Sequence, residues 1–323
     1  MEDPLELVAL AQEHSDKGAI ARLISMIERS ETTGHYDLEE WVTRQDESGF
    51  VVGFTGAPGS GKSTLVDRVI GQIRAIDDRV AVVAVDPSSP FSGGAILGDR
   101  VRMQSHTQDP GVYIRSLATR GHLGGLTVSV PRIVRLLEAL AFPWVLIETV
   151  GVGQVEIEIT GEADATVVVI NPGWGDSIQA NKAGLMEIAD IFVINKADRA
   201  GVRDTRRDLE NMLELGASEH RPPIIETTAT SGDGVVSLFE TLAELKATLD
   251  ANGELARRRG ARRLAEFDRL VMATLRQAAG RVAQGNELRE RVRDGSLTPS
   301  KAAVELVDLI AISLRGEKEK EES

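Results

Sequence analysis

Between residues 50 and about 250, short apolar runs alternate with stretches of helical periodicity. The runs have the length of strands and lack a polar residue at every second position, and they fall at residues 50–54, 80–85, 112–117, 144–148, 166–170, 190–194 and 223–227. Strands that are apolar on both faces are buried between helices, which is typical of a mainly parallel, doubly wound α/β sheet. Ligands bind such sheets at the carboxyl ends of the strands, so candidate site residues are sought there.

Helical patterns without strands flank this region on both sides. Residues 4–28 predict two short amphipathic helices and residues 38–43 a third. We interpret residues 1–47 as a helical extension packed on the main domain of residues 48–250, with a partner-binding arm as the alternative.

A long helical arm is predicted after residue 250. Its arginines are interleaved with acidic residues, which argues against a nucleic-acid patch. Its apolar residues recur at helical spacing, at Leu264, Phe267, Leu270, Val271 and Leu275. An apolar stripe outside the main fold needs a partner surface, so residues 251–315 are expected to join a homodimer. Residues 288–312 predict a helical hairpin with its turn near Pro299, and residues 316–323 are expected to be disordered.

Composition narrows the class of protein. The 323 residues include 37 basic and 50 acidic side chains, a net charge of −13, which disfavours nucleic acid and anionic membranes as partners. With no cysteine, disulfides and thiolate metal sites are excluded. The N-terminus is acidic and no apolar run approaches the ~18 residues of a membrane span, so we expect a cytoplasmic protein.

A phosphate-binding loop follows the first apolar run. Gly56 is separated by four residues from the sequence Gly61-Lys62-Ser63, and a helical pattern follows. This strand, loop and helix context is the one that the motif requires, because glycines aim backbone N–H groups at phosphate oxygens. Lys62 is expected to reach the β- and γ-phosphates and Ser63 to bind Mg²⁺. The residues predicted to bind nucleotide here are Gly56, Ala57, Pro58, Gly59, Ser60, Gly61, Lys62, Ser63 and Thr64.

A second nucleotide-site pattern ends the run 144–148. Four apolar residues are followed by Glu148, where most GTPases have Asp, and then by Gly151. The carboxylate is expected to approach Mg²⁺ through a water, and the Gly151 N–H to lie close to the γ-phosphate. Gln154 and Glu156 lie where a water-orienting residue could sit, and the spacing does not choose between them. Gln154 is the catalytic candidate.

Two further carboxylates lie in a loop rich in proline, serine and glycine. Asp86 ends the run 80–85, and Asp99 follows it in the same loop. Both are candidate catalytic and metal-linked residues of a mobile segment. The alternative for Asp86 is an ordinary turn or cap aspartate. His122 lies in a glycine-rich turn and is left out of the site.

Guanine is the base that the sequence predicts. The run 190–194 is followed by Asn195, Lys196 and, after one residue, Asp198. An aspartate here can accept hydrogen bonds from N1–H and the 2-amino group of guanine, which adenine cannot offer, so GTP is favoured over ATP. Thr228 and Ala229, after the last run, are expected to supply backbone contacts to the base.

Taken in this order, the motifs resemble those of the MeaB/MMAA/ArgK family of GTPases, which are associated with methylmalonyl-CoA mutase. The most specific segments are residues 86–90, Asp-Pro-Ser-Ser-Pro, and residues 148–154, Glu-Thr-Val-Gly-Val-Gly-Gln. The likeness spans roughly residues 45–315.

The resemblance implies a P-loop NTPase of the SIMIBI type that binds GTP or GDP with Mg²⁺ and hydrolyses GTP. It also implies a chaperone that gates cofactor loading of adenosylcobalamin-dependent methylmalonyl-CoA mutase and protects or reactivates it. A cobalamin adenosyltransferase is a further implied partner, and homodimers are implied through the C-terminal arms. Asp86 and Asp99 match the first switch, and residues 173–182 match an extra switch loop that communicates with the mutase.

Two other functions are alternatives to this one. A metallochaperone GTPase shares the phosphate loop, the glutamate-ended strand and the Asn-Lys-x-Asp sequence, but such proteins usually carry Cys and His ligands, and this chain has no Cys and five His. A kinase linked to amino-acid transport needs a base at an acceptor hydroxyl, and none can be identified from the sequence.

Overall fold

The computed structural model describes residues 3–14, 16–29, 36–86, 106, 108–118, 129–149, 159–173, 187–215, 221–282 and 285–321. Its strands are β1 Phe50–Thr55, β2 Val80–Asp86, β3 Val112–Ala118, β4 Trp144–Thr149, β5 Ala165–Ile170, β6 Ile191–Asn195 and β7 Ile224–Thr227. They form one sheet in the order β3-β2-β4-β1-β5-β6-β7, and every pairing in it is parallel. The predicted doubly wound P-loop fold is confirmed.

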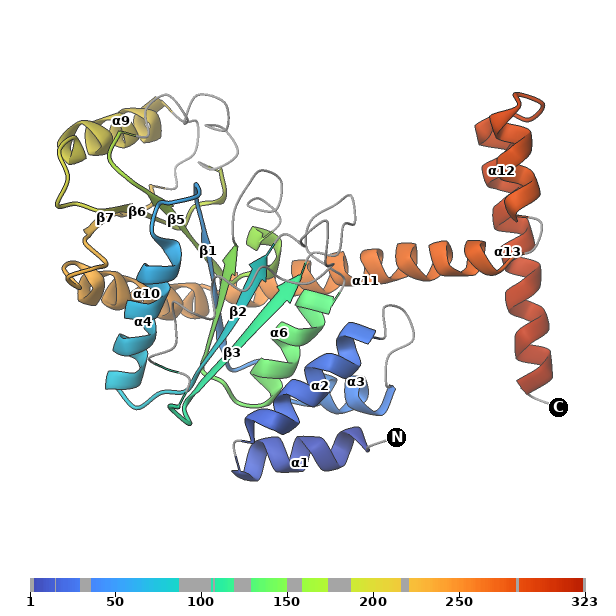
Figure 1. Cartoon of the computed structure of the whole chain (residues 1–323), viewed down its shortest axis with the longest axis horizontal. Helices are drawn as coiled ribbons and strands as arrows, with labels where there is room; N and C mark the ends of the chain where they lie inside the picture. The colour runs from blue at the N-terminus through green and yellow to red at the C-terminus, as the bar shows by residue number, and fades with distance from the viewer. Residues whose placement is uncertain are drawn as a thin grey trace.

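Helices cover both faces of this sheet (Figure 1). Alternate residues of each strand point to opposite faces, so Val51 and Val145 join one core and Val52 and Leu146 the other. One face is covered by α6 Ser129–Ala139 and, near β6, by α9 Val202–Leu215. The other face is covered by α4 Lys62–Ala75 and α10 Val235–Ala251. This double burial explains why the strands carry apolar residues at consecutive positions.

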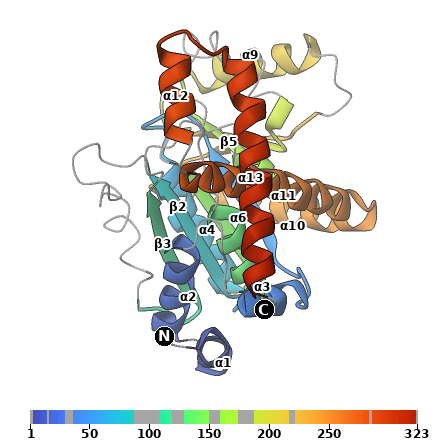
Figure 2. The ribbon, with the colours of Figure 1, turned by 90° about the vertical axis from the view of Figure 1, so that its right-hand side faces the viewer.

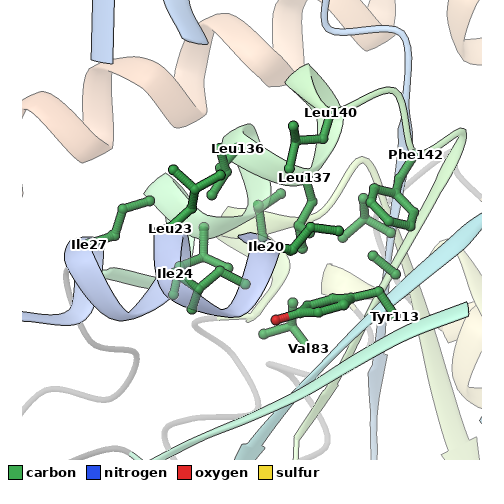
Figure 3. Close-up of a cluster of buried hydrophobic side chains, with 14 of the residues drawn as sticks. Ile20, Leu23, Ile24, Ile27, Val83, Tyr113, Leu136, Leu137, Leu140 and Phe142 are labelled. Atoms are coloured by element: carbon green, nitrogen blue, oxygen red, sulfur yellow. The ribbon is translucent and has the colours of Figure 1, made fainter. Parts of the chain in front are cut away.

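The N-terminal helices are α1 Pro4–His14, α2 Lys17–Arg29 and α3 Tyr36–Thr43. Figure 3 shows the apolar side of α2, with Ile20, Leu23, Ile24 and Ile27, facing the leucines of α6. Arg115 on β3 also pairs with Glu28 of α2. The extension therefore shares the core of the main sheet, as the predicted packing requires.

The arm begins with α11 Glu254–Arg281, which leaves the body of the protein and carries α12 Gly285–Arg293 and α13 Pro299–Glu321 at its far end (Figures 1 and 2). The hairpin turn falls before Pro299, as predicted. The tail differs from the prediction, because α13 continues to Glu321 where we expected disorder from residue 316. Glutamate and lysine are good helix formers, so a charged sequence alone does not end a helix.

Arginines fix the base of α11 to the amino ends of the central strands. Arg258 donates to both carboxylate oxygens of Asp190, at 2.9 and 3.0 Å. Arg259 and Arg262 both reach Asp164, each at 3.0 Å, and the Asp164 carboxylate also accepts from the backbone N–H of Val51 at 2.9 Å. Asp164 and Asp190 directly precede β5 and β6. The arm is thus anchored at the amino ends of the strands, whereas the predicted nucleotide site lies at their carboxyl ends.

No helix in the described part of the chain is both long and apolar enough to cross a membrane.

Candidate functional site

The loop between β1 and α4 has the backbone of a phosphate cradle. Gly56 adopts a φ of 133°, and a Cβ there would lie 2.0 Å from the carbonyl oxygen of Val169 on β5. Gly61 precedes α4 with a φ of 96°. Positive φ angles favour glycine, and the approach to β5 leaves no space for a side chain at residue 56. The helix α4 therefore starts with its free backbone N–H groups turned toward the carboxyl edge of the sheet.

Lys62 lies inside this loop. Its side chain is 6% exposed, and its ammonium donates to the carbonyl oxygens of Gly56 and, at 3.1 Å, of Ala57. The hydroxyl of Ser60 is buried and has no hydrogen-bond partner among the described residues. A buried hydroxyl of this kind, together with the ammonium, fits a ligand rich in acceptor oxygens such as a phosphate.

The next pair of residues joins this loop to the neighbouring strand. Ser63 Oγ donates to Glu148 Oε1 at 2.5 Å, and Glu148 is 1% exposed at the end of β4. A second contact joins β4 to β1, because the hydroxyl of Thr149 donates to the Phe54 carbonyl at 3.4 Å. Hydroxyl and carboxylate oxygens are the ligands that Mg²⁺ prefers, so the pair fits the predicted metal.

The other predicted metal and catalytic residues are only partly described. Asp86 ends β2, whose neighbouring residues Ala84 and Val85 pair with Glu148 and Thr149 of β4. The backbone therefore brings Asp86 to the same edge as Glu148. The side chain of Asp86, and the whole of Asp99, Gly151 and Gln154, lie outside the described residues. Within the described residues, no group of three or more His, Cys, Asp or Glu could hold a metal ion.

Asn195 connects the phosphate loop to the predicted base-binding segments. It is 2% exposed at the end of β6, and its Nδ2 donates to the Ser60 carbonyl at 2.8 Å. Its Oδ1 accepts from the Thr227 hydroxyl and the Ala229 N–H, both at 3.1 Å. A Cβ on Gly61 would lie 2.3 Å from Asn195 Nδ2. The side-chain amide of Asn195 thus joins the end of β6 to the phosphate loop, to the end of β7 and to the turn that follows β7.

The residues after Asn195 line the same edge. Lys196 has a φ of 59°, and its ammonium donates to the Gly59 carbonyl at 2.6 Å. The Ala197 N–H donates to the Thr227 carbonyl at 3.0 Å, which ties the turn to β7. Asp198 is exposed beyond this turn. Its carboxylate is therefore open to a base entering from solvent.

Residues 228–234 form a compact turn beside Asn195, which we call the base loop. The Thr228 N–H donates to the Asp233 carbonyl at 2.9 Å, and Ser231 Oγ donates to the Asp233 carboxylate at 2.6 Å. Ala229 is only 3% exposed. Its N–H is bonded to Asn195, so the predicted backbone contacts at Thr228 and Ala229 belong to a loop whose shape Asn195 helps to set.

Sequence reasoning missed Arg68. This side chain on α4 donates to the carbonyl oxygens of Ala229 and Thr230, both at 2.9 Å. Its partners lie 161 and 162 residues further along the chain. No local pattern marks such a contact, because it depends on α4 and the base loop packing on the same side of the sheet.

Known proteins similar to this chain were found by sequence and by structure. The family model described as "Methylmalonyl Co-A mutase-associated GTPase MeaB" matches residues 20–284. A Pyrococcus horikoshii protein named as a GTPase is 41% identical over 306 residues, which cover 93% of this chain and 96% of the relative. The mouse protein named "Methylmalonic aciduria type A homolog, mitochondrial" is 34% identical over 264 residues, 79% of this chain and 64% of the relative.

A solved structure supports the fold. The structure described as a LAO/AO transport system kinase aligns with a TM-score of 0.68 at 21% identity, covering 95% of this chain and 97% of that one.

Proposed function

Because this chain belongs to the MeaB family of methylmalonyl-CoA mutase-associated GTPases, we propose that it is a G-protein chaperone of an adenosylcobalamin-dependent methylmalonyl-CoA mutase. GTP hydrolysis is the switch in this proposal. The observation that carries the nucleotide site is the 2.5 Å contact between Ser63 of the phosphate loop and Glu148 at the end of β4. The name of the mouse relative and the family description support the choice of client.

In the reaction, water attacks the γ-phosphate of GTP in line, the bond from the γ-phosphorus to the β,γ-bridging oxygen breaks, and GDP and inorganic phosphate are released. Negative charge that develops on the phosphate oxygens is met by the Lys62 ammonium and by the N–H groups at the start of α4, which the fold holds in place beforehand. Ser63 and Glu148 would hold Mg²⁺ together with Asp86 and Asp99, and Mg²⁺ neutralises phosphate charge when bound. Gly151 and Gln154 are assigned to the γ-phosphate and to the attacking water on the sequence pattern.

Recognition of guanine is assigned to the segments joined by Asn195. In this proposal Asp198 accepts hydrogen bonds from N1–H and the 2-amino group, while Lys196 and the base loop with Thr228 and Ala229 flank the ring. A nucleotide that cannot satisfy these groups leaves them unpaired, which supports a selectivity of about a thousandfold or more for GTP over ATP.

The partner-facing parts of the proposal are residues 173–182 and the arm. Residues 173–182, of which the structure describes only Gly173, follow β5 in the sequence and are assigned to communication with the mutase, with a cobalamin adenosyltransferase as a further partner. The arm is assigned to homodimerisation. This assignment is supported by its exposed side chains Leu264, Phe267, Val271, Met272 and Leu275 on α11, and Val304 and Val307 on α13.

The test uses GTP labelled at the γ-phosphate, with and without purified methylmalonyl-CoA mutase. We expect slow release of phosphate to water by the chain alone and at least about tenfold acceleration by the mutase, because no arginine of the chain is assigned to the transition state. Lys62→Ala is the inactive control. The same rate of hydrolysis with and without the mutase would contradict the mutase as the client and favour another metalloenzyme in that role. Transfer of the label to a protein would indicate a kinase.

A further inference from the structure

Arg68 links the helix of the phosphate loop to the base loop. It lies on α4, six residues after Lys62, and its guanidinium donates through Nε to the Ala229 carbonyl and through Nη2 to the Thr230 carbonyl, both at 2.9 Å. Two neighbouring N–H groups therefore bond two successive carbonyl oxygens. This planar fork is a property of arginine that lysine cannot reproduce.

Arg68 contacts the residue of the base loop that Asn195 also bonds. Ala229 is buried, with its N–H bonded to Asn195 and its carbonyl bonded to Arg68. The other described bonds of the loop are internal to it, such as Thr228 to Asp233 and Ser231 to Asp233, or come from the start of α10, which directly follows the loop. Asn195 and Arg68 thus bond both backbone groups of Ala229, the N–H from β6 and the carbonyl from α4.

We propose that Arg68 is a positioning residue for guanine recognition, which acts by holding the base loop against the phosphate-binding helix. This inference rests on the guanine nucleotide site proposed above. Arg68 itself contacts backbone carbonyls and lies well along α4 from the phosphate loop. Its removal therefore loosens the part of the site that meets the base and leaves the part that meets the phosphates intact.

Two ligands distinguish the base-binding part of the site from the phosphate-binding part. One contains a base and the other consists of phosphate alone. We compare dissociation constants for GDP and for inorganic tripolyphosphate in wild type, Arg68→Ala and Arg68→Lys. We expect Arg68→Ala to weaken GDP about tenfold, through loss of two charge-assisted hydrogen bonds, and to leave tripolyphosphate unchanged. Arg68→Lys keeps the charge but loses the fork, so it recovers only a minor part of the loss.

Arg221→Ala is the matched control. Arg221 is exposed just before the amino end of β7, whereas the base loop follows the carboxyl end of that strand. It is expected to leave both affinities unchanged. The proposal is overturned if Arg68→Ala binds GDP like wild type, if GDP and tripolyphosphate weaken equally, or if Arg68→Lys binds GDP like wild type. Failure of wild type to bind GDP would instead refute the proposed nucleotide site.

Discussion

Single residues fix the phosphate loop through their backbone geometry. Gly56 and Gly59 both have positive φ angles, 133° and 75°, so both conformations favour glycine. They differ in their surroundings, because a Cβ at Gly56 would lie 2.0 Å from the Val169 carbonyl, whereas a Cβ at Gly59 would meet nothing within 4 Å. The pair therefore separates backbone strain from steric exclusion.

We predict that Gly56→Ala lowers the free energy of unfolding by about 3 kcal/mol or more, since a backbone carbonyl of a central strand cannot move aside. Gly59→Ala is expected to lose only about 1 kcal/mol, from φ strain alone. Urea denaturation of the two variants without nucleotide measures the difference. Equal losses would show that the close approach to β5 is not what restricts residue 56.

At this scale the sequence predicted the motif residues and missed their cross-links. Lys62, Ser63, Glu148 and Asn195 could be predicted as site residues because each lies at a fixed spacing from an apolar run that forms a strand. The bond from Asn195 to Ser60 joins residues 135 positions apart and was not predicted. Arg68 was missed for the same reason. Contacts of this kind follow from which strand ends meet, and that information is distributed over the whole sheet.

Among the elements, α11 shows that an interleaved charge pattern does not identify all the partners of its side chains. We interpreted its arginines as balanced by acids on the same helix, and Glu254 does pair with Arg257 and Arg258. The structure adds acids from other elements, chiefly Asp164 and Asp190. Each of these aspartates directly precedes an apolar run in the sequence. That position indicates the start of a strand, but it does not indicate which arginine the aspartate pairs with.

Glu138, at the end of α6, makes this anchor sensitive to pH. It is 1% exposed, and burial raises its pKa from its ordinary value of 4.5 to about 7, against the opposing effect of Arg262 and Arg259 and with the support of Asp164 and Glu47. Between about pH 4.5 and 7, the folded state therefore keeps a proton on Glu138 that the unfolded chain has already released. The contribution of this group to stability falls as pH rises through that window and is constant above it.

We predict that Glu138→Gln becomes more stable relative to wild type as the pH rises from 5 to 8. The relative gain should be on the order of 2 kcal/mol, because the glutamine stays neutral throughout. Urea denaturation at several pH values measures it. The exposed Glu240→Gln variant on α10 controls for loss of one negative charge. A gain for Glu138→Gln that is independent of pH would contradict the assignment.

The whole molecule consists of a closed α/β body with an arm that leaves apolar side chains exposed. Leu264, Phe267, Val271 and Leu275 lie at helical spacing on one side of α11, and Leu264 and Phe267 are 63% and 60% exposed. Exposed apolar residues aligned in this way mark an interface. The sequence predicted the stripe from its period, but period alone does not identify the surface that covers it.

We predict that Phe267→Asp shifts the protein from dimer to monomer at micromolar concentration, because a charge would be buried in the arm interface. Light scattering after size exclusion measures the mass. Arg203→Asp also introduces an aspartate at an exposed position, on α9 and therefore outside the arm, and is expected to leave the dimer intact. A wild-type monomer, or a dimer in both variants, would contradict the assignment of the arm.

The central claim is that the ends of β1, β4, β6 and β7 form a site for a guanine nucleotide. Titration calorimetry with GDP and ADP in the presence of Mg²⁺ tests it most directly, with Asp198→Ala as the variant of the base-reading residue. The account predicts that wild type binds GDP at least about a thousandfold more tightly than ADP, and that Asp198→Ala loses most of this preference. Equal affinity of wild type for GDP and ADP would contradict it.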